Sequence, residues 1–341
     1  MTQIAGGQNG RGDAAPRGAT ITAIGGYVPE RVLTNRDLEE MVDTSDEWIV
    51  QRTGIHERRI AAPDEFTSDM CTGAARDLAR RFDTDLKDVD FIIVATTTPD
   101  YAFPSVASQV QDRLGIPAAG AIDLNATCAG FAYGLHIAHG LVASGVNRKV
   151  LVLAGETLSK VTDYTDRATC VLFGDGAGAA LVEPAREGDD FLAYLHGSQG
   201  SGGRHLYRQA ISRRFDPEEE KSYMRQNGRE VYKWAVQTIS AGVLELLEKA
   251  GLAPLDIDWF VPHSANLRIT DAICDRTGIP FDRMLESGSG YGNTSSASIP
   301  LALSDAVREN RIRYGDTVLL YGFGGGLVHA GMICRWTAGG A

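Results

Sequence analysis

The sequence is poor in cysteine and has no long apolar run. Five cysteines in 341 residues are too few for a disulfide scaffold, and none forms the C-x-x-C pair that would support a zinc site. The longest apolar stretches, such as 150–155, are far too short to span a bilayer, and residues 1–18 lack the apolar core of a signal peptide or anchor. We therefore expect a cytoplasmic protein with free thiols, no metal site and no membrane association.

Basic residues are also in short supply. The chain has 33 Lys and Arg against 44 Asp and Glu, a formal net charge of −11, which disfavours binding to nucleic acid or to an anionic membrane. A hydrophobic content of 43% and a charged content of 23% exclude disordered and collagen-like classes. The length fits two domains or a duplicated pair.

From residue 19 the pattern is α/β, and its elements occur twice in one order. The order is helix, Asp-x-Asp strand, Gly-Ile-Pro, small-residue helix and apolar strand: 67–82, 88–94, 115–117, 127–144 and 149–154, then 232–250, 256–261, 278–280, 295–309 and 316–321. Such a repeat predicts two similar α/β halves, over 19–185 and 186–341, with largely parallel strands buried on both faces. We expect residues 1–18 to form a flexible tail and residues 186–227 to form a surface loop or lid-like insertion.

Cys128 stands among small residues, in Asn125-Ala126-Thr127-Cys128-Ala129-Gly130, at the predicted start of a helix. The helix that follows has no polar stripe, which indicates that it is buried in the middle of the molecule. A thiol at a helix N-terminus meets the positive end of the helix dipole, so its pKa should fall and the nucleophilic thiolate should be favoured. The alternative is that Cys128 only fills a tight helix contact.

Two polar residues follow other elements of the second half. His263 comes directly after an apolar strand, at the carboxyl end where α/β sheets bind ligands. Asn293 opens the helix that corresponds to the Cys128 helix in the duplication. A satisfied core histidine and an ordinary N-cap are the alternatives. If the halves are related by a pseudo-twofold, however, Cys128, His263 and Asn293 should converge on one pocket.

A glycine cluster, Gly322-Phe323-Gly324-Gly325-Gly326, follows the last predicted apolar strand. It could aim N–H groups at a developing oxyanion, or cradle a phosphate, although no Gly-Lys-Ser/Thr follows. Together with the cysteine, histidine and asparagine, it suggests either amide hydrolysis or acyl transfer with carbon–carbon bond formation.

Beyond these residues, the chain resembles β-ketoacyl-acyl-carrier-protein synthase III of the thiolase superfamily, from residue 19 to residue 336. Further segments carry the resemblance: Asp43-Thr44-Ser45-Asp46-Glu47-Trp48-Ile49, Arg52-Thr53-Gly54-Ile55, Ala102-Phe103-Pro104-Ser105 and Phe173-Gly174-Asp175-Gly176-Ala177-Gly178-Ala179. The resemblance implies a thiolase-like fold, with the two halves in a five-layered αβαβα arrangement.

The resemblance also implies a reaction. Cys128 would be acylated by an acyl-CoA starter, and malonyl-acyl-carrier-protein would then lose CO₂. His263 and Asn293 would stabilise the resulting enolate, which attacks the acyl-cysteine in a decarboxylative Claisen condensation. The N–H groups of Cys128 and Gly325 would form the oxyanion hole. No cofactor is implied, because acyl-CoA is a substrate.

Further positions match the family's contacts with its substrates and partners. Trp48 and Arg167 would sandwich the adenine of coenzyme A, Thr44 and Arg52 would bind elsewhere on it, and Asn266 would line the pantetheine tunnel. Lys233 and Arg268 match positions that meet the acidic carrier protein. Phe103 matches a residue that reaches into the acyl pocket of a second subunit, which implies a homodimer.

Two departures from the family pattern leave the starter open. Ser264 replaces the glutamine that often follows the histidine, and Val328-His329-Ala330 replaces Thr-Trp-Gly. We expect His329 to pack the last strand rather than line the acyl pocket. The simplest function is initiation of type II fatty-acid synthesis from acetyl-CoA. The alternatives are another starter, for polyketide or biotin precursor synthesis, and a non-condensing acyltransferase or thioesterase.

Overall fold

A computed structural model describes residues 18–212, 214–218 and 222–339. All of the predicted tail except Gly18 lies outside these residues. The first half contains β1 (Ala19–Tyr27), β2 (Arg31–Thr34), α1 (Asn35–Glu39), α2 (Asp46–Thr53), β3 (Glu57–Ile60), α3 (Thr67–Arg81), β4 (Phe91–Ala95), α4 (Val106–Leu114), β5 (Gly120–Leu124), α5 (Gly130–Ala143), β6 (Val150–Glu156), α6 (Arg167–Cys170) and β7 (Gly176–Pro184). The second half contains β8 (Phe191–Ser198), β9 (Leu206–Arg208), β10 (Met224–Gln226), α7 (Gly228–Ala250), β11 (Trp259–Pro262), α8 (Leu267–Thr277), α9 (Gly288–Tyr291), α10 (Ser298–Arg308), β12 (Thr317–Gly324) and β13 (Val328–Arg335). Single 3-10 turns, η1 (Thr127–Ala129) and η6 (Ser295–Ala297), precede α5 and α10.

Two main sheets repeat one topology. The first has the strand order β1-β7-β6-β4-β5, and the second has the order β11-β12-β13-β8. Reversed, the second order places β8, β13, β12 and β11 where the first has β1, β7, β6 and β4. Even β5 has a trace of a counterpart, because Met284 forms an isolated parallel bridge with Phe260 of β11. We propose that the halves divide near residues 185 and 186, between β7 and β8.

The prediction of largely parallel strands was wrong, because both sheets are mixed. Strand β4 pairs parallel with β5 and β6, and β11 pairs parallel with β12. Strands β7 and β13 instead run antiparallel to both of their neighbours. Only three residues, 325–327, join β12 to β13, and a parallel pairing would need a crossover connection of a dozen residues or more.

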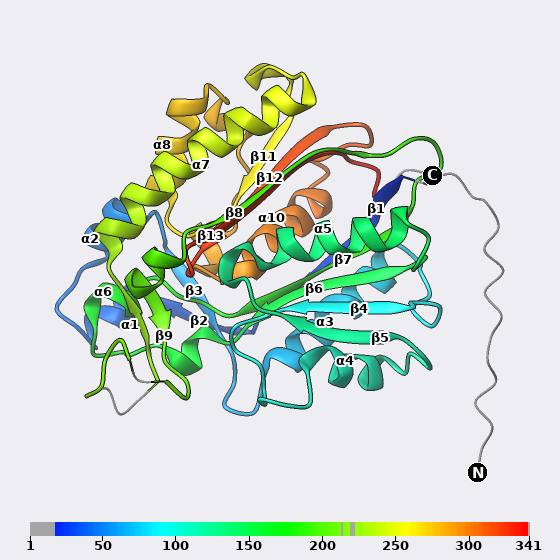
Figure 1. Cartoon of the computed structure of the whole chain (residues 1–341). Helices are drawn as coiled ribbons and strands as arrows, with labels where there is room; N and C mark the ends of the chain where they lie inside the picture. Colours follow the sequence, from blue (N-terminus) through cyan, green and yellow to red (C-terminus); the bar gives the residue numbers. More distant parts are fainter. Residues whose placement is uncertain (1–17, 213, 219–221, 340–341) are drawn as a thin grey trace, which may run out of the picture.

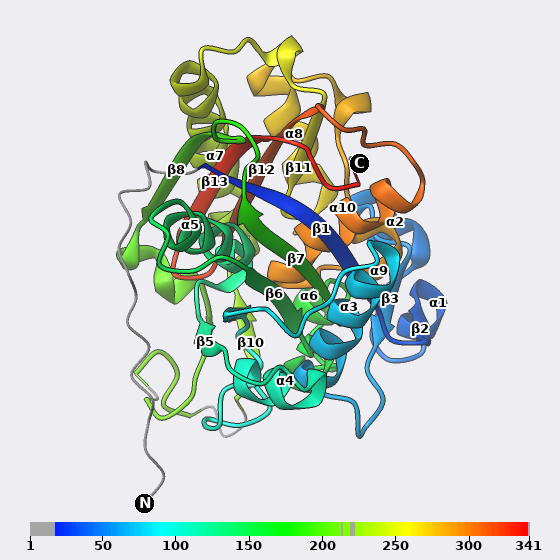
Figure 2. The same ribbon diagram turned by 90° about the vertical axis from the view of Figure 1, so that its right-hand side faces the viewer.

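The sheets and helices form five layers (Figure 1). Helices α7 and α8 cover the outer face of the second sheet, and α3 and α4 cover the outer face of the first. Helices α5 and α10 lie between the two sheets, as the rotated view also shows (Figure 2). This is the αβαβα order that the resemblance implied.

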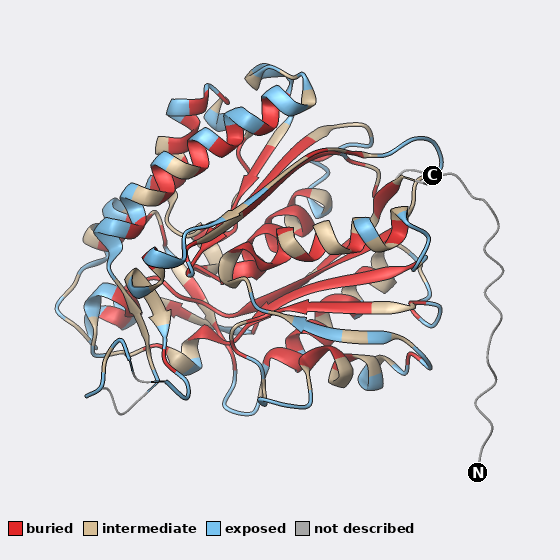
Figure 3. Ribbon diagram, in the orientation of Figure 1, coloured by how far each residue is buried: buried red, intermediate tan, exposed pale blue. Residues whose placement is uncertain are grey.

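Burial follows this layering (Figure 3). The middle helices and the centres of both sheets are buried, whereas α7 and α8 expose their outward faces. The mostly apolar surface of α5 is explained by its place, because a helix packed between two sheets has apolar neighbours on most sides.

The segment predicted as a surface insertion, 186–227, is partly structural. Residues Phe191–Ser198 form β8, which pairs with β13 and completes the second sheet. Glycine and arginine in the rest of the segment obscured this strand. Further along the segment, β9 pairs antiparallel with β10.

Candidate active site

A single cavity of about 570 Å³ brings together the three residues on which the sequence prediction depends. Cys128, His263 and Asn293 all line it, although they come from three separate elements. The wall also contains four other predicted site residues: Trp48, Arg52, Asn266 and Gly325. Seven of the residues named from the sequence therefore border one continuous space.

The backbone that presents Cys128 is bent sharply. After β5 the chain enters η1, where Thr127 adopts the left-handed region at φ 44°, and α5 begins two residues after the cysteine, at Gly130. The Thr127 hydroxyl donates to the Gly325 carbonyl at 2.8 Å, which ties this turn to the glycine cluster. All five cysteines are free; four are buried, and Cys128 is partly buried.

The predicted depression of the Cys128 pKa is wrong for the free protein. Burial, with a smaller contribution from the negative charge of Glu156, raises the pKa of this thiol to about 12, and the Ser295 hydroxyl only partly opposes this rise. The sequence showed the helix N-terminus but not the low dielectric around the sulfur, and desolvation outweighs the helix dipole. The resting cysteine is therefore a thiol.

His263 lies where β11 ends. Its backbone N–H donates to the Tyr321 carbonyl at 2.8 Å, and its ring meets Phe323 edge to face with the centroids 5.3 Å apart. Nδ1 lies 2.7 Å from the Ser298 hydroxyl. Burial lowers the pKa of the imidazole to about 3, so the ring is neutral at physiological pH.

Asn293 is fixed from its carbonyl side. Its Oδ1 accepts the backbone N–H of Ser295 at 2.9 Å, and its Nδ2 donates to the Ala265 carbonyl at 3.4 Å. An amide has two N–H donors, so Asn293 retains a donor beyond this long contact. The chain then bends at Ser295, with φ 53°, before α10 begins at Ser298.

The glycine cluster lies directly against the cysteine. A Cβ atom added to Gly324 would lie 2.9 Å from Sγ of Cys128. Only a glycine backbone can approach the thiol so closely, and both Gly324 and Gly325 line the cavity.

Sequence reasoning missed Glu156 beside the cysteine. This residue ends β6, is fully buried, and accepts hydrogen bonds from the Thr97 backbone N–H and from the Thr97 and Thr98 hydroxyls. Burial raises the pKa of its carboxyl group. The signal was available, because a lone acid after an apolar strand stands at the ligand-binding edge of the sheet.

Of the predicted coenzyme A residues, Trp48, Arg52 and Asn266 line the cavity, and Arg167 lies against Trp48. The Arg167 guanidinium lies 4.8 Å from the Trp48 ring centroid, and that of Arg52 lies 5.9 Å from it. Asn266 donates to the Arg52 carbonyl at 3.2 Å. Thr44 does not line the cavity, but its hydroxyl oxygen is buried and has no hydrogen-bond partner among the described residues.

The other predicted residues lie away from the cavity wall. Phe103 is 86% exposed, and Lys233 and Arg268 are exposed on α7 and at the start of α8. Arg268 donates to the Gln51 carbonyl at 2.9 Å. His329 packs against the Tyr321 ring and bonds its hydroxyl at 2.9 Å, so the packing prediction for this histidine is confirmed.

Ser264, the other departure from the family pattern, is buried and does not line the cavity. Its hydroxyl accepts the backbone N–H of Ser287 at 3.1 Å. This serine therefore fixes a neighbouring loop.

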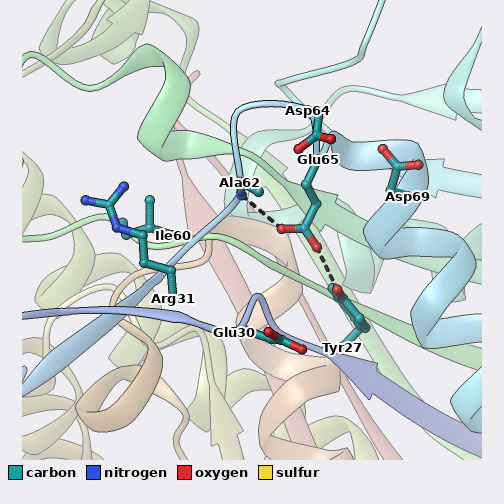
Figure 4. A pocket seen from close by; sticks show the side chains of 8 residues that line it. All are labelled: Tyr27, Glu30, Arg31, Ile60, Ala62, Asp64, Glu65 and Asp69. Atoms are coloured by element: carbon teal, nitrogen blue, oxygen red, sulfur yellow. Dashed lines mark hydrogen bonds between the residues drawn. The ribbon is translucent and has the colours of Figure 1, made fainter.

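A second cavity, of about 610 Å³, is lined by acidic residues (Figure 4). Glu65 accepts hydrogen bonds from the Tyr27 hydroxyl at 2.6 Å and the Ala62 N–H at 3.1 Å. Asp69 pairs with Arg113 at 2.6 Å. Glu65 and Asp69 therefore already have structural partners, and no thiol or histidine lines this cavity.

Two features are absent from the described part of the chain. Within it, no helix combines the length and apolar character needed to cross a membrane. Across the same residues, no group of three or more histidine, cysteine or acidic side chains is placed to hold a metal ion.

Comparison with known proteins points to one family. The model for 3-oxoacyl-[acyl-carrier-protein] synthase III matches residues 122–200, and the model for its C-terminal region matches residues 247–336. The chain is 60% identical over 321 residues to β-ketoacyl-[acyl-carrier-protein] synthase III 2 of Halalkalibacterium halodurans, covering 94% of this chain and 97% of that protein. The corresponding protein of Bacillus subtilis is 56% identical over 320 residues, covering 93% and 98%.

Solved structures agree with the sequence comparison. The synthase III of Thermus thermophilus superposes with a TM-score of 0.90 at 52% identity, covering 94% of this chain and all of that one. A priming β-ketosynthase from the R1128 polyketide pathway superposes with a TM-score of 0.91 at 37% identity, covering 96% and 99%.

Proposed function

This chain belongs to the β-ketoacyl-[acyl-carrier-protein] synthase III family, and from that membership we propose that it condenses an acyl-CoA starter with malonyl-acyl-carrier-protein. The products are a 3-oxoacyl-acyl-carrier-protein, CO₂ and free coenzyme A, and the reaction initiates type II fatty-acid synthesis. The observation that carries the proposal is the convergence of a thiol, an imidazole and a carboxamide in one cavity.

In the first half-reaction, Cys128 takes the acyl group. Its sulfur attacks the thioester carbonyl, the carbon–sulfur bond to coenzyme A breaks, and the departing thiolate ends as a protonated thiol. The oxyanion of the tetrahedral intermediate is stabilised by the N–H groups of Cys128 and Gly325. The raised pKa of Cys128 means that the thiolate forms only as the reaction proceeds.

In the second half-reaction, malonyl-acyl-carrier-protein loses CO₂. The electron pair of the broken carbon–carbon bond becomes an enolate, whose oxygen accepts hydrogen bonds from Nε2 of His263 and Nδ2 of Asn293. The enolate carbon attacks the acyl-cysteine and expels the Cys128 sulfur. Decarboxylation supplies the carbanion, so no side chain has to remove an α-proton. A neutral imidazole, which burial enforces, donates without adding charge.

Coenzyme A enters along the wall of Trp48, Arg52 and Asn266. In the free protein Arg167 rests directly on the Trp48 ring, so the adenine must displace this guanidinium to lie between them. The Thr44 hydroxyl oxygen is buried and has no hydrogen-bond partner among the described residues, so it could reach coenzyme A only if the neighbouring chain moved. Lys233 and Arg268 supply exposed positive charge on α7 and α8 for the acidic carrier protein.

A homodimer is supported by the unpaired edge of the first sheet. Strand β5 pairs only with β4, and Ile122 at its centre is 41% exposed. Phe103, at 86% exposure, and Tyr101, at 59%, lie on the loop before α4. An open strand edge beside exposed aromatic rings is disfavoured in monomers, and pairing the five-residue β5 with a second copy would cover both. Sedimentation of wild type and of Ile122→Pro tests this proposal, with a monomeric variant expected.

Acetyl-CoA is the starter we propose. The similarity to a polyketide priming β-ketosynthase makes another starter the second candidate. A panel of acetyl-, isobutyryl-, hexanoyl- and pimeloyl-CoA with malonyl-acyl-carrier-protein, analysed by product mass, decides between them. Acetyl-CoA should give the highest kcat/KM, and a preference of tenfold or more for any other starter would contradict this choice.

Separate assays of the half-reactions test the roles of the three residues. Cys128→Ala should take up no acyl label from acyl-CoA. His263→Ala and Asn293→Ala should still become acylated but should lose condensation by about 100- to 1,000-fold, because each removes an oxyanion donor. Label uptake by Cys128→Ala at the wild-type rate would mean that the nucleophile lies elsewhere. Normal condensation by both other variants would mean that neither residue stabilises the enolate, whereas an acylated wild type that fails to condense would favour a non-condensing acyltransferase.

A further inference from the structure

The Ser298 hydroxyl lies behind His263, on the side away from the cavity. This serine begins α10, is fully buried and does not line the cavity. Its Oγ lies 2.7 Å from Nδ1 of His263, 2.9 Å from the Ser295 carbonyl oxygen and 3.3 Å from the Ser264 nitrogen. Three polar groups therefore meet one hydroxyl that has a single proton to donate.

Counting the donors leaves two arrangements for that proton. The Ser264 N–H must donate to Oγ, so the Ser298 proton goes either to the Ser295 carbonyl or to Nδ1 of His263. In the first case Nδ1 must carry a proton of its own, and Nε2 is an acceptor. In the second case Nδ1 accepts, and Nε2 carries the proton.

The Ser295 carbonyl does not need the hydroxyl. It already accepts the backbone N–H of Ser298 in the turn that precedes α10. No buried acceptor is left unpaired when the hydroxyl turns to Nδ1, and that contact is the shorter of the two. The packing therefore permits the arrangement in which the imidazole presents Nε2–H to the cavity.

We propose that Ser298 is a positioning residue that donates its hydroxyl proton to Nδ1 of His263 and so holds the imidazole in the Nε2–H form. This inference rests on the proposed function, because it concerns the donor that the enolate oxygen needs. The opposite form would direct a lone pair at the enolate oxygen, and the two would repel.

The neighbouring asparagine is set by the same turn. The Ser295 N–H occupies Oδ1 of Asn293 at 2.9 Å, which leaves the amide nitrogen as the donor. The stretch from Ser295 to Ser298 thus orients the carboxamide with a backbone N–H and the imidazole with a hydroxyl. Both partners of the enolate are prepared as donors before the substrate arrives.

Nitrogen-15 NMR of histidine-labelled wild-type protein tests the proposal without any substitution. Correlating each ring nitrogen with the ring carbon-bound protons distinguishes Nε2–H from Nδ1–H imidazole, and His263→Ala identifies the signal of interest among seven histidines. We expect a protonated Nε2 and an unprotonated Nδ1 at pH 7. Protonation at Nδ1 alone would overturn the proposal, whatever the enzyme catalyses.

Two variants link the tautomer to the chemistry. Ser298→Ala should shift the His263 signal toward the Nδ1–H form and slow condensation roughly 100-fold, while acylation of Cys128 stays within a few-fold of wild type. Ser298→Thr keeps the hydroxyl and should retain both the signal and the rate. Condensation at the wild-type rate by a folded Ser298→Ala would overturn the proposal.

The proposed condensation activity and the proposed role of Ser298 can be refuted separately. If wild-type protein neither acylates Cys128 nor condenses, the proposed function is wrong, and the NMR result still reports the tautomer. If wild type condenses but Ser298→Ala slows acylation and condensation equally, the serine acts on general structure, and its role in the tautomer is refuted.

Discussion

Adding one methyl group at Gly324 should displace the Cys128 thiol and slow acylation. The Cβ of Gly324→Ala would lie 2.8 Å from Cys128 Cβ, 2.9 Å from Sγ and 2.9 Å from the Thr127 hydroxyl oxygen. Comfortable separations are about 3.5–4.0 Å, so either the thiol or the strand must move by roughly 1 Å. A displacement of that size at a reacting atom costs about 100-fold in rate.

The same substitution should also lower stability, because extra methylenes in a tight core cost about 1–3 kcal/mol. Single-turnover acylation with labelled acetyl-CoA, followed by intact mass, measures the rate. Urea denaturation measures the free energy of unfolding. We expect acylation to fall about 100-fold while most of the protein stays folded at 25 °C.

Gly140→Ala is the matched control. Gly140 lies in α5, the helix that leads away from Cys128, and a Cβ there meets no atom within 4 Å. Gly140 stands in the last turn of α5, and replacing a helical glycine with alanine should stabilise the protein by up to about 1 kcal/mol and leave acylation unchanged. If Gly324→Ala acylates as fast as this control, close contact with the glycine does not position the thiol.

Three further outcomes follow from the same geometry. Trp48→Ala should raise the KM for acetyl-CoA about 5- to 150-fold, because roughly 1–3 kcal/mol of adenine stacking is lost. The KM for acetyl-pantetheine, which has no adenine, should not change. Equal effects on both substrates would contradict the stacking of adenine between Trp48 and Arg167. Glu156→Gln should shift the pH profile of Cys128 alkylation by iodoacetamide to lower pH, because the carboxylate raises the pKa of this thiol, whereas an unchanged profile would mean that this charge does not reach the sulfur. Burial lowers the pKa of His136 to about 4. Between about pH 6.5 and pH 4 the histidine is protonated in the unfolded chain but not in the native protein, so the free energy of unfolding should fall as the pH drops through this range. His136→Gln should remove up to about 3 kcal/mol of that loss in urea titrations, and an unchanged acid dependence in the variant would argue against a buried neutral ring.

The sequence predicted the order of elements better than their pairing. The repeat of helix, strand, Gly-Ile-Pro, helix and strand identified both halves, and the five-layered fold agrees with the solved relatives. The pairing direction of the strands was predicted wrongly because it depends on the length of the connections, as the three residues between β12 and β13 show. Strand β8 was not predicted, because its partner, β13, lies more than a hundred residues further along the chain.

The chemistry of the site was predicted by residue type but not by environment. Cys128, His263 and Asn293 could be named because each stands at the end of a recognisable element. The raised pKa of the thiol could not be foreseen, since it depends on burial and on Glu156, which arrives from a distant strand. Ser298 gave no signal of its own, because its role follows from the 2.7 Å contact with the imidazole.

The two bent turns before α5 and α10 have the same backbone shape but hold different reactive groups, Cys128 in the first half and Asn293 in the second. Thr127 and Ser295 occupy matching places, in Asn125-Ala126-Thr127-Cys128 and Asn293-Thr294-Ser295-Ser296, and both have a positive φ. A symmetrical ancestor would have held two equivalent centres facing each other. In the present chain the position that matches the nucleophile is Ser296, buried and bonded to the Ala95 carbonyl at 3.3 Å. The asparagine stands in both copies, at 125 and 293, but the sulfur stands only in the first and His263 only in the second, so neither half holds the cysteine, the histidine and Asn293 by itself.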